Sequence, residues 1–205
     1  ATSGGIGVSG SVARPHFFSG FVEQPVIDAQ SILLLARVAR TRFYVPPNSL
    51  AAILRAADPV VTATAEGLRF ESFSACCGVY ARLDVDASAL DGMHMTTGVT
   101  NVDVNPPLRQ ALATVRASEP LHLNVGSDAL RVSTPRGEVV EDKVPLPKRW
   151  LKGFAETQML AAGMTLRHEL NAAQARQFIQ ALPKSSATKT VMWAVQAARS
   201  LRLAS

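Results

Sequence analysis

The amino-acid sequence predicts an α+β fold built from a duplicated β-α-β-β-β unit. Two stretches, Arg42–Asp86 and Asn101–Pro147, show the same patterns in the same order. Each has a short β-type run, a proline pair that opens an amphipathic segment, and three further strand-like runs separated by turn residues. Agreement of five successive patterns indicates an internal repeat, and such a repeat determines the architecture of the domain.

The first copy places its helix between two proline-containing breaks. A Pro46-Pro47 pair follows the β-type run Phe43–Val45 and opens a predicted helix over Asn48–Ala57. Proline is tolerated in the first turn because the N–H that it lacks would have no intrahelical partner there. Asp58-Pro59 ends this helix, and three predicted strands follow it: Val60–Thr64, Leu68–Phe73 and Val79–Val85.

The second copy repeats this arrangement. A Pro106-Pro107 pair follows the run Val102–Val104, and the predicted helix Pro107–Ala117 ends before Glu119-Pro120. Its apolar face has the spacing of an amphipathic helix, with Leu108, Leu112 and Val115. Three predicted strands complete the copy: Leu121–Val125, Leu130–Thr134 and Val139–Val144.

The segments on either side of the repeat give three predicted parts: a flexible segment over residues 1–15, the main domain over 16–147, and a C-terminal part over 148–205. The aromatic cluster His16–Phe21 is expected to anchor the chain just before a helix over Glu23–Arg40.

The C-terminal part is expected to hold two helices and a β-hairpin. That order is typical of a winged helix, and it is equally typical of an appendage that packs on the repeat. The predicted elements are Lys148–Ala162, Ala172–Leu182, Val191–Val195 and Ser200–Leu203.

The composition is that of a globular protein and excludes several classes. Of the 205 residues, 47% are hydrophobic and 18% are charged, and no run is long enough to be a membrane helix. The only two cysteines are adjacent, which argues against a disulfide scaffold, and no signal peptide is recognisable, so a cytoplasmic location is expected. The net charge of +5 is compatible with a nucleic-acid partner without requiring one.

The cysteine pair is the one candidate for reactive chemistry. Cys76 and Cys77 lack the spacing of a zinc site, so no metal ligand and no cofactor is predicted in this chain. As an alternative, either thiol could be a nucleophile if folding brought His94 or His122 next to it. A buried role is favoured, because cysteine outside disulfides is among the most buried residue types. With no P-loop, G-x-S-x-G or H-E-x-x-H motif present, we expect a binding module and not an enzyme.

The duplicated β-α-β-β-β unit resembles one domain of the DNA sliding clamps. In those proteins paired helices line the inside of a ring and the sheets form its outside. The resemblance implies that the helices at Asn48–Ala57 and Pro107–Ala117 face DNA, with Arg55, Arg109 and Arg116 as phosphate contacts. Exposed edge strands would also allow a homo-oligomer.

Longer stretches resemble the N-terminal region of bacterial SWIM zinc-finger proteins. They are ATSGG at Ala1–Gly5, HFFSGF at His16–Phe21, RFESFSACCGVYARLD at Arg69–Asp84, NVDVNPPLR at Asn101–Arg109 and KVPLPKRWLKGFAE at Lys143–Glu156. This resemblance implies a larger parent protein that binds nucleic acid or protein, with MoxR-type ATPases and von Willebrand A-domain proteins as partners. It also implies a C-x-C…C-x-H zinc site in the parent. Because no such motif occurs in this sequence, zinc is expected only outside it.

Overall fold

The computed structural model describes residues 16–41, 59–94, 96–146, 148–183, 192–197 and 200–204. The chain forms two compact units, residues 1–157 and 158–205, and each is described separately. The described part of the first unit holds two helices, nine strands and the start of a further helix, α4. In chain order they are β1 (His16–Val22), α1 (Pro25–Arg40), β2 (Val60–Thr64), β3 (Gly67–Phe73), β4 (Tyr80–Asp86), the 3₁₀ turn η1 (Ala87–Ala89), β5 (Leu90–His94), β6 (Gly98–Asn101), α3 (Pro106–Ala113), β7 (His122–Gly126), β8 (Ala129–Thr134), β9 (Gly137–Asp142) and α4 (Lys148–Ala162).

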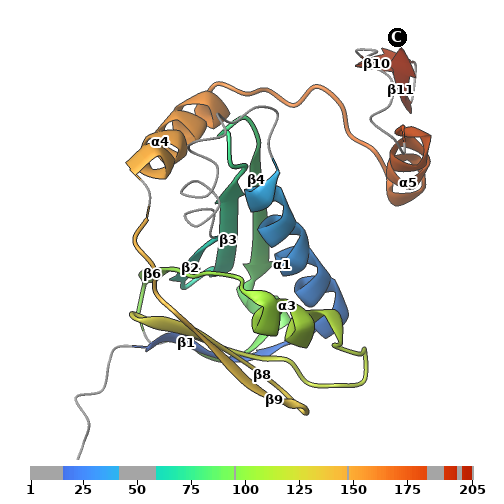
Figure 1. Ribbon diagram of the computed structural model, residues 1–205. Coiled ribbons are helices and arrows are strands. Elements are labelled where there is room, and N and C mark those ends of the chain that lie inside the picture. The colour runs from blue at the N-terminus through green and yellow to red at the C-terminus, as the bar shows by residue number, and fades with distance from the viewer. Residues whose placement is uncertain are drawn as a thin grey trace, which may run out of the picture. The chain divides into compact units, whose positions relative to one another are not determined.

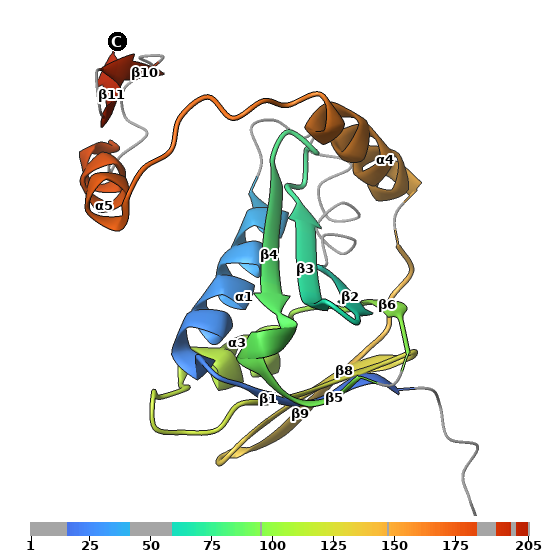
Figure 2. The same ribbon diagram turned by 180° about the vertical axis from the view of Figure 1, so that it is seen from behind.

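Two antiparallel sheets make up the body of the first unit (Figures 1 and 2). One sheet has five strands in the order β5-β1-β7-β8-β9, and the other has four in the order β4-β3-β2-β6. Every pair of neighbouring strands in these sheets is antiparallel. The predicted α+β class is therefore confirmed.

The two copies of the repeat exchange their first strands. The copies are β1-α1-β2-β3-β4 and β6-α3-β7-β8-β9, yet β1 pairs with β7 and β6 pairs with β2. The segment after each copy also returns to that copy's first strand: β5 pairs with β1, and the backbone N–H of Val144 donates to the carbonyl of Asn101 at 2.9 Å. Each sheet thus contains strands of both copies, and the copies are interlocked.

The first copy starts earlier in the chain than the sequence predicts. The run Phe43–Val45 and the helix Asn48–Ala57 lie outside the described residues. The strand and helix that match β6 and α3 are β1 and α1, so the His16–Phe21 cluster is itself a strand. The signal for this strand is weak because a glycine, Gly20, stands on its inward face, where an added Cβ would lie 2.4 Å from the Cα of Gly92 on β5. This close approach of two backbones requires glycine.

The other boundaries agree closely with the predicted ones. The last three strands of each copy match within two residues at each end, and α1 begins two residues after the predicted start. The predicted first strand of the second copy, Val102–Val104, is wrong: that strand is β6, Gly98–Asn101. The end of α3 also differs, since the helix stops at Ala113 and not at Ala117. There the hydroxyl of Thr114 donates to the carbonyls of Gln110 and Ala111, both at 3.1 Å, and satisfies groups that the helix end would leave unpaired.

One apolar core joins both sheets to both helices. The buried face of α1 includes Ile32 and Leu35, and that of α3 is Leu108 and Leu112. These side chains pack in a single cluster with the inward residues of the strands, among them Leu68, Phe70, Leu123, Val125, Leu130 and Val132. A smaller cluster holds Trp150 of α4, which is fully buried with its ring 5.7 Å from that of Phe73.

The second unit contains a helix and a hairpin. The helix α5 (Ala172–Ala181) begins at Asn171, whose side chain and that of Gln174 form a reciprocal capping box. The strands β10 (Trp193–Ala197) and β11 (Ser200–Ala204) form an antiparallel pair. The predicted helix and strand pair are therefore present. None of the described helices is long and apolar enough to cross a membrane.

Two leucines on the paired helices provide a stability test of the single core. Leu108 of α3 is fully buried, whereas Leu34 of α1 is 57% exposed. Leu108→Ala should lower the free energy of unfolding by about 2–5 kcal/mol through lost burial and the cavity left behind. The control Leu34→Ala should change it by less than about 0.5 kcal/mol. Urea unfolding measures both, and equal effects of the two variants would contradict the packing described above.

Candidate functional site

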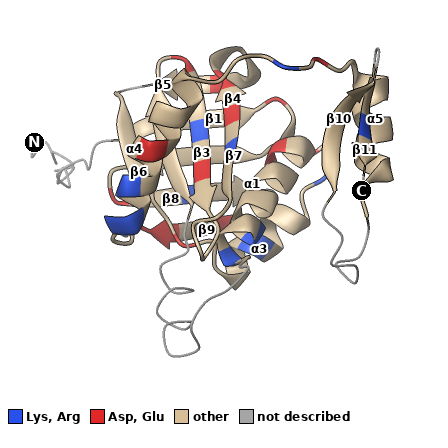
Figure 3. Ribbon diagram, turned by 90° about the horizontal axis from the view of Figure 1, so that it is seen from above, with Lys and Arg blue, Asp and Glu red and all other residues tan. Residues whose placement is uncertain are grey.

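The helices α1 and α3, one from each copy, lie side by side in both views of the first unit (Figures 1 and 2). Residues spaced three or four apart on α1 remain exposed, and toward its C-terminal end this exposed face carries Arg37 and Arg40. The only acidic residue of α1, Asp28, is buried. Arg109 is the only charged residue of α3, which therefore shows blue and no red in Figure 3.

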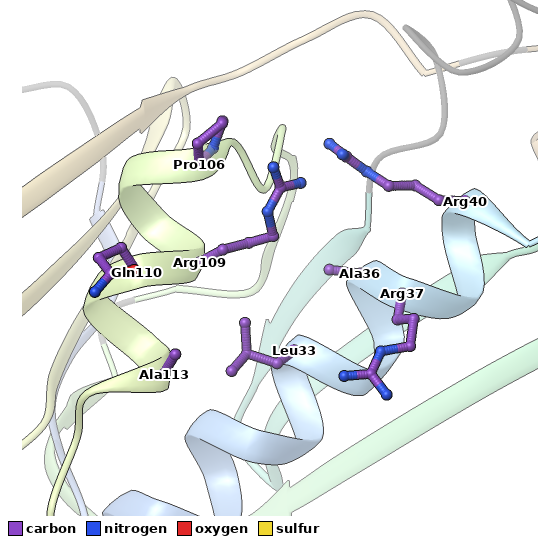
Figure 4. A pocket seen from close by; sticks show the side chains of 8 residues that line it. All are labelled: Leu33, Ala36, Arg37, Arg40, Pro106, Arg109, Gln110 and Ala113. Atoms are coloured by element: carbon purple, nitrogen blue, oxygen red, sulfur yellow. The ribbon is translucent and has the colours of Figure 1, made fainter.

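A groove of about 580 Å³ runs between the two helices. Its described lining includes no aspartate or glutamate: Leu33, Ala36, Arg37 and Arg40 come from α1, and Pro106, Arg109, Gln110 and Ala113 come from α3. Figure 4 shows the side chains of Arg40 and Arg109 extending toward one another across the groove, while Arg37 points away from Arg40. Three guanidinium groups thus surround one hollow that both copies build.

Arg109 is held in place by the start of its own helix. The side chain of Asn105, the residue before α3, accepts a hydrogen bond from the backbone N–H of Leu108 at 3.2 Å and caps the helix. The Nη1 atom of Arg109 donates to the carbonyl oxygen of Val104 at 3.1 Å. One end of the guanidinium is therefore tethered, and its other N–H donors remain for a ligand.

Arg37 and Arg40 occupy the last turn of α1, where positive charge complements the helix dipole. The Nη2 atom of Arg40 lies 4.0 Å from the carboxylate of Asp103, and both side chains are nearly half exposed. An exposed pair at this distance contributes about 0–1 kcal/mol and leaves much of the arginine charge available. The groove therefore has a positive potential from three arginines, opposed at its rim by Asp103.

The three predicted phosphate contacts fall in different places. Arg55 lies outside the described residues. Arg109 lies in the groove, whereas Arg116 is exposed in the loop after α3, where its backbone N–H donates to Glu119 at 3.2 Å. In the sequence, Arg37 and Arg40 had the charge pattern of an ordinary helix C-terminus. Their place in the groove becomes visible only once α1 is known to be the partner of α3.

A buried carboxyl group, that of Glu141, contacts the residue that caps the start of α3. Glu141 of β9 is 3% exposed, and its Oε2 atom accepts a hydrogen bond from the side-chain amide of Asn105 at 2.6 Å. Burial, together with the nearby carboxylates of Asp103 and Asp142, raises the pKa of Glu141 to about 7. The cap of α3, and through it Arg109, is therefore linked to a group that titrates near neutral pH.

The cysteine pair lacks the surroundings of a nucleophile. Cys76 and Cys77 lie between β3 and β4, where Cys77 has a positive φ of 56°. The predicted buried role is wrong, because Cys76 is only half-buried and Cys77 is exposed. Partial desolvation still raises the pKa of the Cys77 thiol, which lowers the fraction of reactive thiolate. His122 lies in the other sheet, 3.3 Å from the hydroxyl of Ser19, and the side chain of His94 is outside the described residues. No group of three or more potential metal ligands occurs in the part of the chain that the structure describes.

Comparison with known proteins gives likeness at the level of fold only. No protein-family model matches the chain, and no curated protein matches it. The similar solved structures include sliding clamps. The proliferating cellular nuclear antigen of Entamoeba histolytica is 10% identical with a TM-score of 0.45, over 65% of this chain and 53% of its own. The DNA polymerase III β subunit of Borrelia burgdorferi is 14% identical with a TM-score of 0.43, over 66% and 32%. That of Pseudomonas aeruginosa is 13% identical with a TM-score of 0.41, over 86% and 41%.

The chain thus spans about half or less of the length of these clamps. They share the predicted architecture, in which helices and antiparallel sheets are combined. Because all three TM-scores lie below 0.5, we draw no functional conclusion from the likeness.

The Glu141 carboxyl gives a pH-dependent prediction. Its pKa is 4.5 in the unfolded chain and about 7 in the fold, so the folded chain binds this proton more tightly. The resulting stabilisation is complete below about pH 4.5 and is lost as the pH rises through about 7. Glu141→Gln keeps an acceptor for Asn105 without a charge, and at about pH 8 it should raise the free energy of unfolding by on the order of 2–3 kcal/mol.

The advantage of this variant should shrink toward zero as the pH falls to about 4.5, because the wild-type carboxyl is then protonated in both states. Urea unfolding at a series of pH values measures the difference. An advantage of the same size at every pH would show that Glu141 does not titrate as described.

Proposed function

We propose that the first unit is a non-catalytic binding scaffold whose α1–α3 groove contacts the phosphate backbone of a nucleic acid. The observation that carries this proposal is the set of three arginines, Arg37, Arg40 and Arg109, around a groove without a carboxylate in its described lining. Guanidinium groups match phosphate geometry and bind it by paired hydrogen bonds. Because the arginines come from both α1 and α3, a phosphate backbone that lies along the groove can contact guanidinium groups on both of its sides.

The groove chemistry favours contact with the backbone over sequence recognition. Arginine contacts to phosphate neutralise charge and release counterions, which makes binding depend on salt but not on base sequence. The described lining holds one side-chain amide, Gln110, and otherwise apolar residues besides the arginines. We therefore infer a duplex or other regular backbone as the ligand, held without base-specific contacts.

A protein partner is the second candidate, and the exposed face of α1 favours it. Ile27 and Leu34 are 58% and 57% exposed on the helix that also carries the two groove arginines. A neighbouring apolar and basic surface suits an acidic protein segment with apolar anchors. Binding of such a partner would depend on the two aliphatic residues as well as on the arginines.

The wider assignment to SWIM zinc-finger proteins stays a prediction, since no family model matches. Three further expectations also remain predictions. They are the zinc site elsewhere in the parent protein, the MoxR-type ATPase and von Willebrand A-domain partners, and the cytoplasmic location. The alternative of an enzyme with a Cys76 or Cys77 nucleophile is disfavoured by the raised pKa of the Cys77 thiol. Slow alkylation of both thiols at neutral pH would argue further against it.

Binding of duplex DNA as a function of salt tests the proposal. Each of Arg37→Ala, Arg40→Ala and Arg109→Ala should lower affinity and reduce the slope of log K against log salt by about 0.9. Arg131→Ala is the matched control, because it removes the same charge from the outward face of β8. Fluorescence anisotropy with two unrelated sequences should give the same affinities.

Binding that is undetectable at low salt would reject the nucleic-acid proposal and favour the protein partner. An effect of Arg131→Ala equal to that of the groove variants would show that only net charge matters, and it would equally reject the groove as the site.

A further inference from the structure

The three residues before α3 connect two groove arginines to a buried carboxyl group. Arg109 donates from Nη1 to the carbonyl oxygen of the middle residue at 3.1 Å, and the Nη2 atom of Arg40 lies 4.0 Å from the carboxylate of the first, Asp103. The last of the three, Asn105, donates from its side-chain amide to the Oε2 atom of Glu141 at 2.6 Å. The groove and Glu141 therefore contact the same short piece of chain.

The Glu141 carboxyl is half satisfied by the described part of the chain. Its side chain is 3% exposed, and its Oε1 atom is buried without a hydrogen-bond partner among the described residues. An ionised carboxylate accepts hydrogen bonds at both oxygens, so a buried oxygen that lacks them penalises the charged form. A proton on Glu141 removes this penalty and leaves the hydrogen bond from Asn105 in place.

The charged groups of the segments packed around Glu141 oppose its ionisation. Asp103 from the segment before α3 and Asp142 from β9 are both negative. The only charge on α3 is that of Arg109, which lines the groove. Arg131, the charged residue of the neighbouring strand β8, stands opposite the residue before Glu141 and therefore on the outward face of the sheet. Two carboxylates thus face Glu141 together with one arginine that the groove shares.

A phosphate group bound in the groove would be a further negative charge close to this segment. It would contact Arg40 and Arg109, whose side chains extend toward one another across the groove in Figure 4. An ionised Glu141 competes with phosphate for the positive potential of these guanidinium groups, whereas a protonated Glu141 does not. Lys143, two residues beyond Glu141, is exposed, so solvent screens its charge. Phosphate and a proton on Glu141 therefore favour each other, and this coupling is reciprocal.

We propose that the groove binds phosphate and a proton together, with Glu141 as the group that takes up the proton. The inference rests on the function proposed above for the groove and assigns its regulation by pH. Glu141 is a positioning residue, because it acts on the groove through Asn105 and the two residues before it.

The sign and range of the pH dependence follow from this coupling. Because bound phosphate favours the protonated form, the pKa of Glu141 is higher in the complex than the value of about 7 in the free protein. The gain in affinity is therefore complete below about pH 7, and it is lost as the pH rises through the higher pKa of the complex.

Titration calorimetry with a duplex DNA that lacks terminal phosphates tests this inference at fixed low salt. At about pH 8, Glu141→Gln should bind about threefold more tightly than the wild type, because the amide carries no charge. At about pH 6 the two proteins should bind equally, since the wild-type carboxyl is then protonated. Measured in two buffers of different ionisation enthalpy near pH 7.5, the wild type should take up more protons on binding than Glu141→Gln does.

Glu138→Gln is the matched control, because it removes the same charge from the exposed, outward face of the same strand. Its effect on affinity should be small and the same at every pH. Histidines also titrate in this range, but they are present in all three proteins and cancel in the comparison.

The outcomes separate this inference from the function on which it rests. Binding that is absent at every pH would reject the groove function and the proton coupling together. Binding with the same pH dependence and proton uptake in the wild type and Glu141→Gln would overturn the coupling alone. A change of equal size at every pH would show that Glu141 acts only through the structure, and a matching effect of Glu138→Gln would show that only net charge matters. Either result would also overturn the coupling.

Discussion

The structure of the first unit depends on the exchange of first strands between the two copies. Because β1 pairs with β7 and β6 pairs with β2, neither sheet is complete without the other copy. The inward faces of both sheets then share one core, and the two helices lie next to each other over it. A groove lined from both helices is the direct result, so the site exists only in the assembled unit.

The arginines of this groove are joined to the core by a short chain of contacts. Arg109 is tethered to Val104 beside the capping residue Asn105, whose amide donates to the buried Glu141. Arg37 and Arg40 are positioned by α1, whose opposite face is packed on the sheet of β3 and β4. The positions of the three arginines are therefore set by the packing of α1 and α3 on the core.

Local patterns in the sequence predicted the last three strands of each copy well, because period-two alternation and turn residues are local signals. They did not predict β1, β5 or β6. The start of the first copy was placed at Phe43 because the Pro46-Pro47 pair resembles the pair that opens α3. The strand that matches β6 is β1, and its signal in the sequence is weakened by Gly20. Arg109 was predicted from the helix that carries it. The basic end of α1 at Arg37 and Arg40 was visible in the sequence as a charge pattern that favours a helix C-terminus over a phosphate contact. The proximity of these arginines to Arg109 was not, because it comes from long-range pairing of strands that no single stretch of sequence reveals.

The claim that the groove between α1 and α3 is the nucleic-acid contact is tested most directly by site-specific photo-crosslinking. A photoreactive residue at Gln110, which lines the groove, should crosslink to duplex DNA at low salt. The same residue at Glu138, which is exposed on the outward face of β9, should not. Crosslinking from Glu138 and none from Gln110, or equal yields from both, would contradict the account.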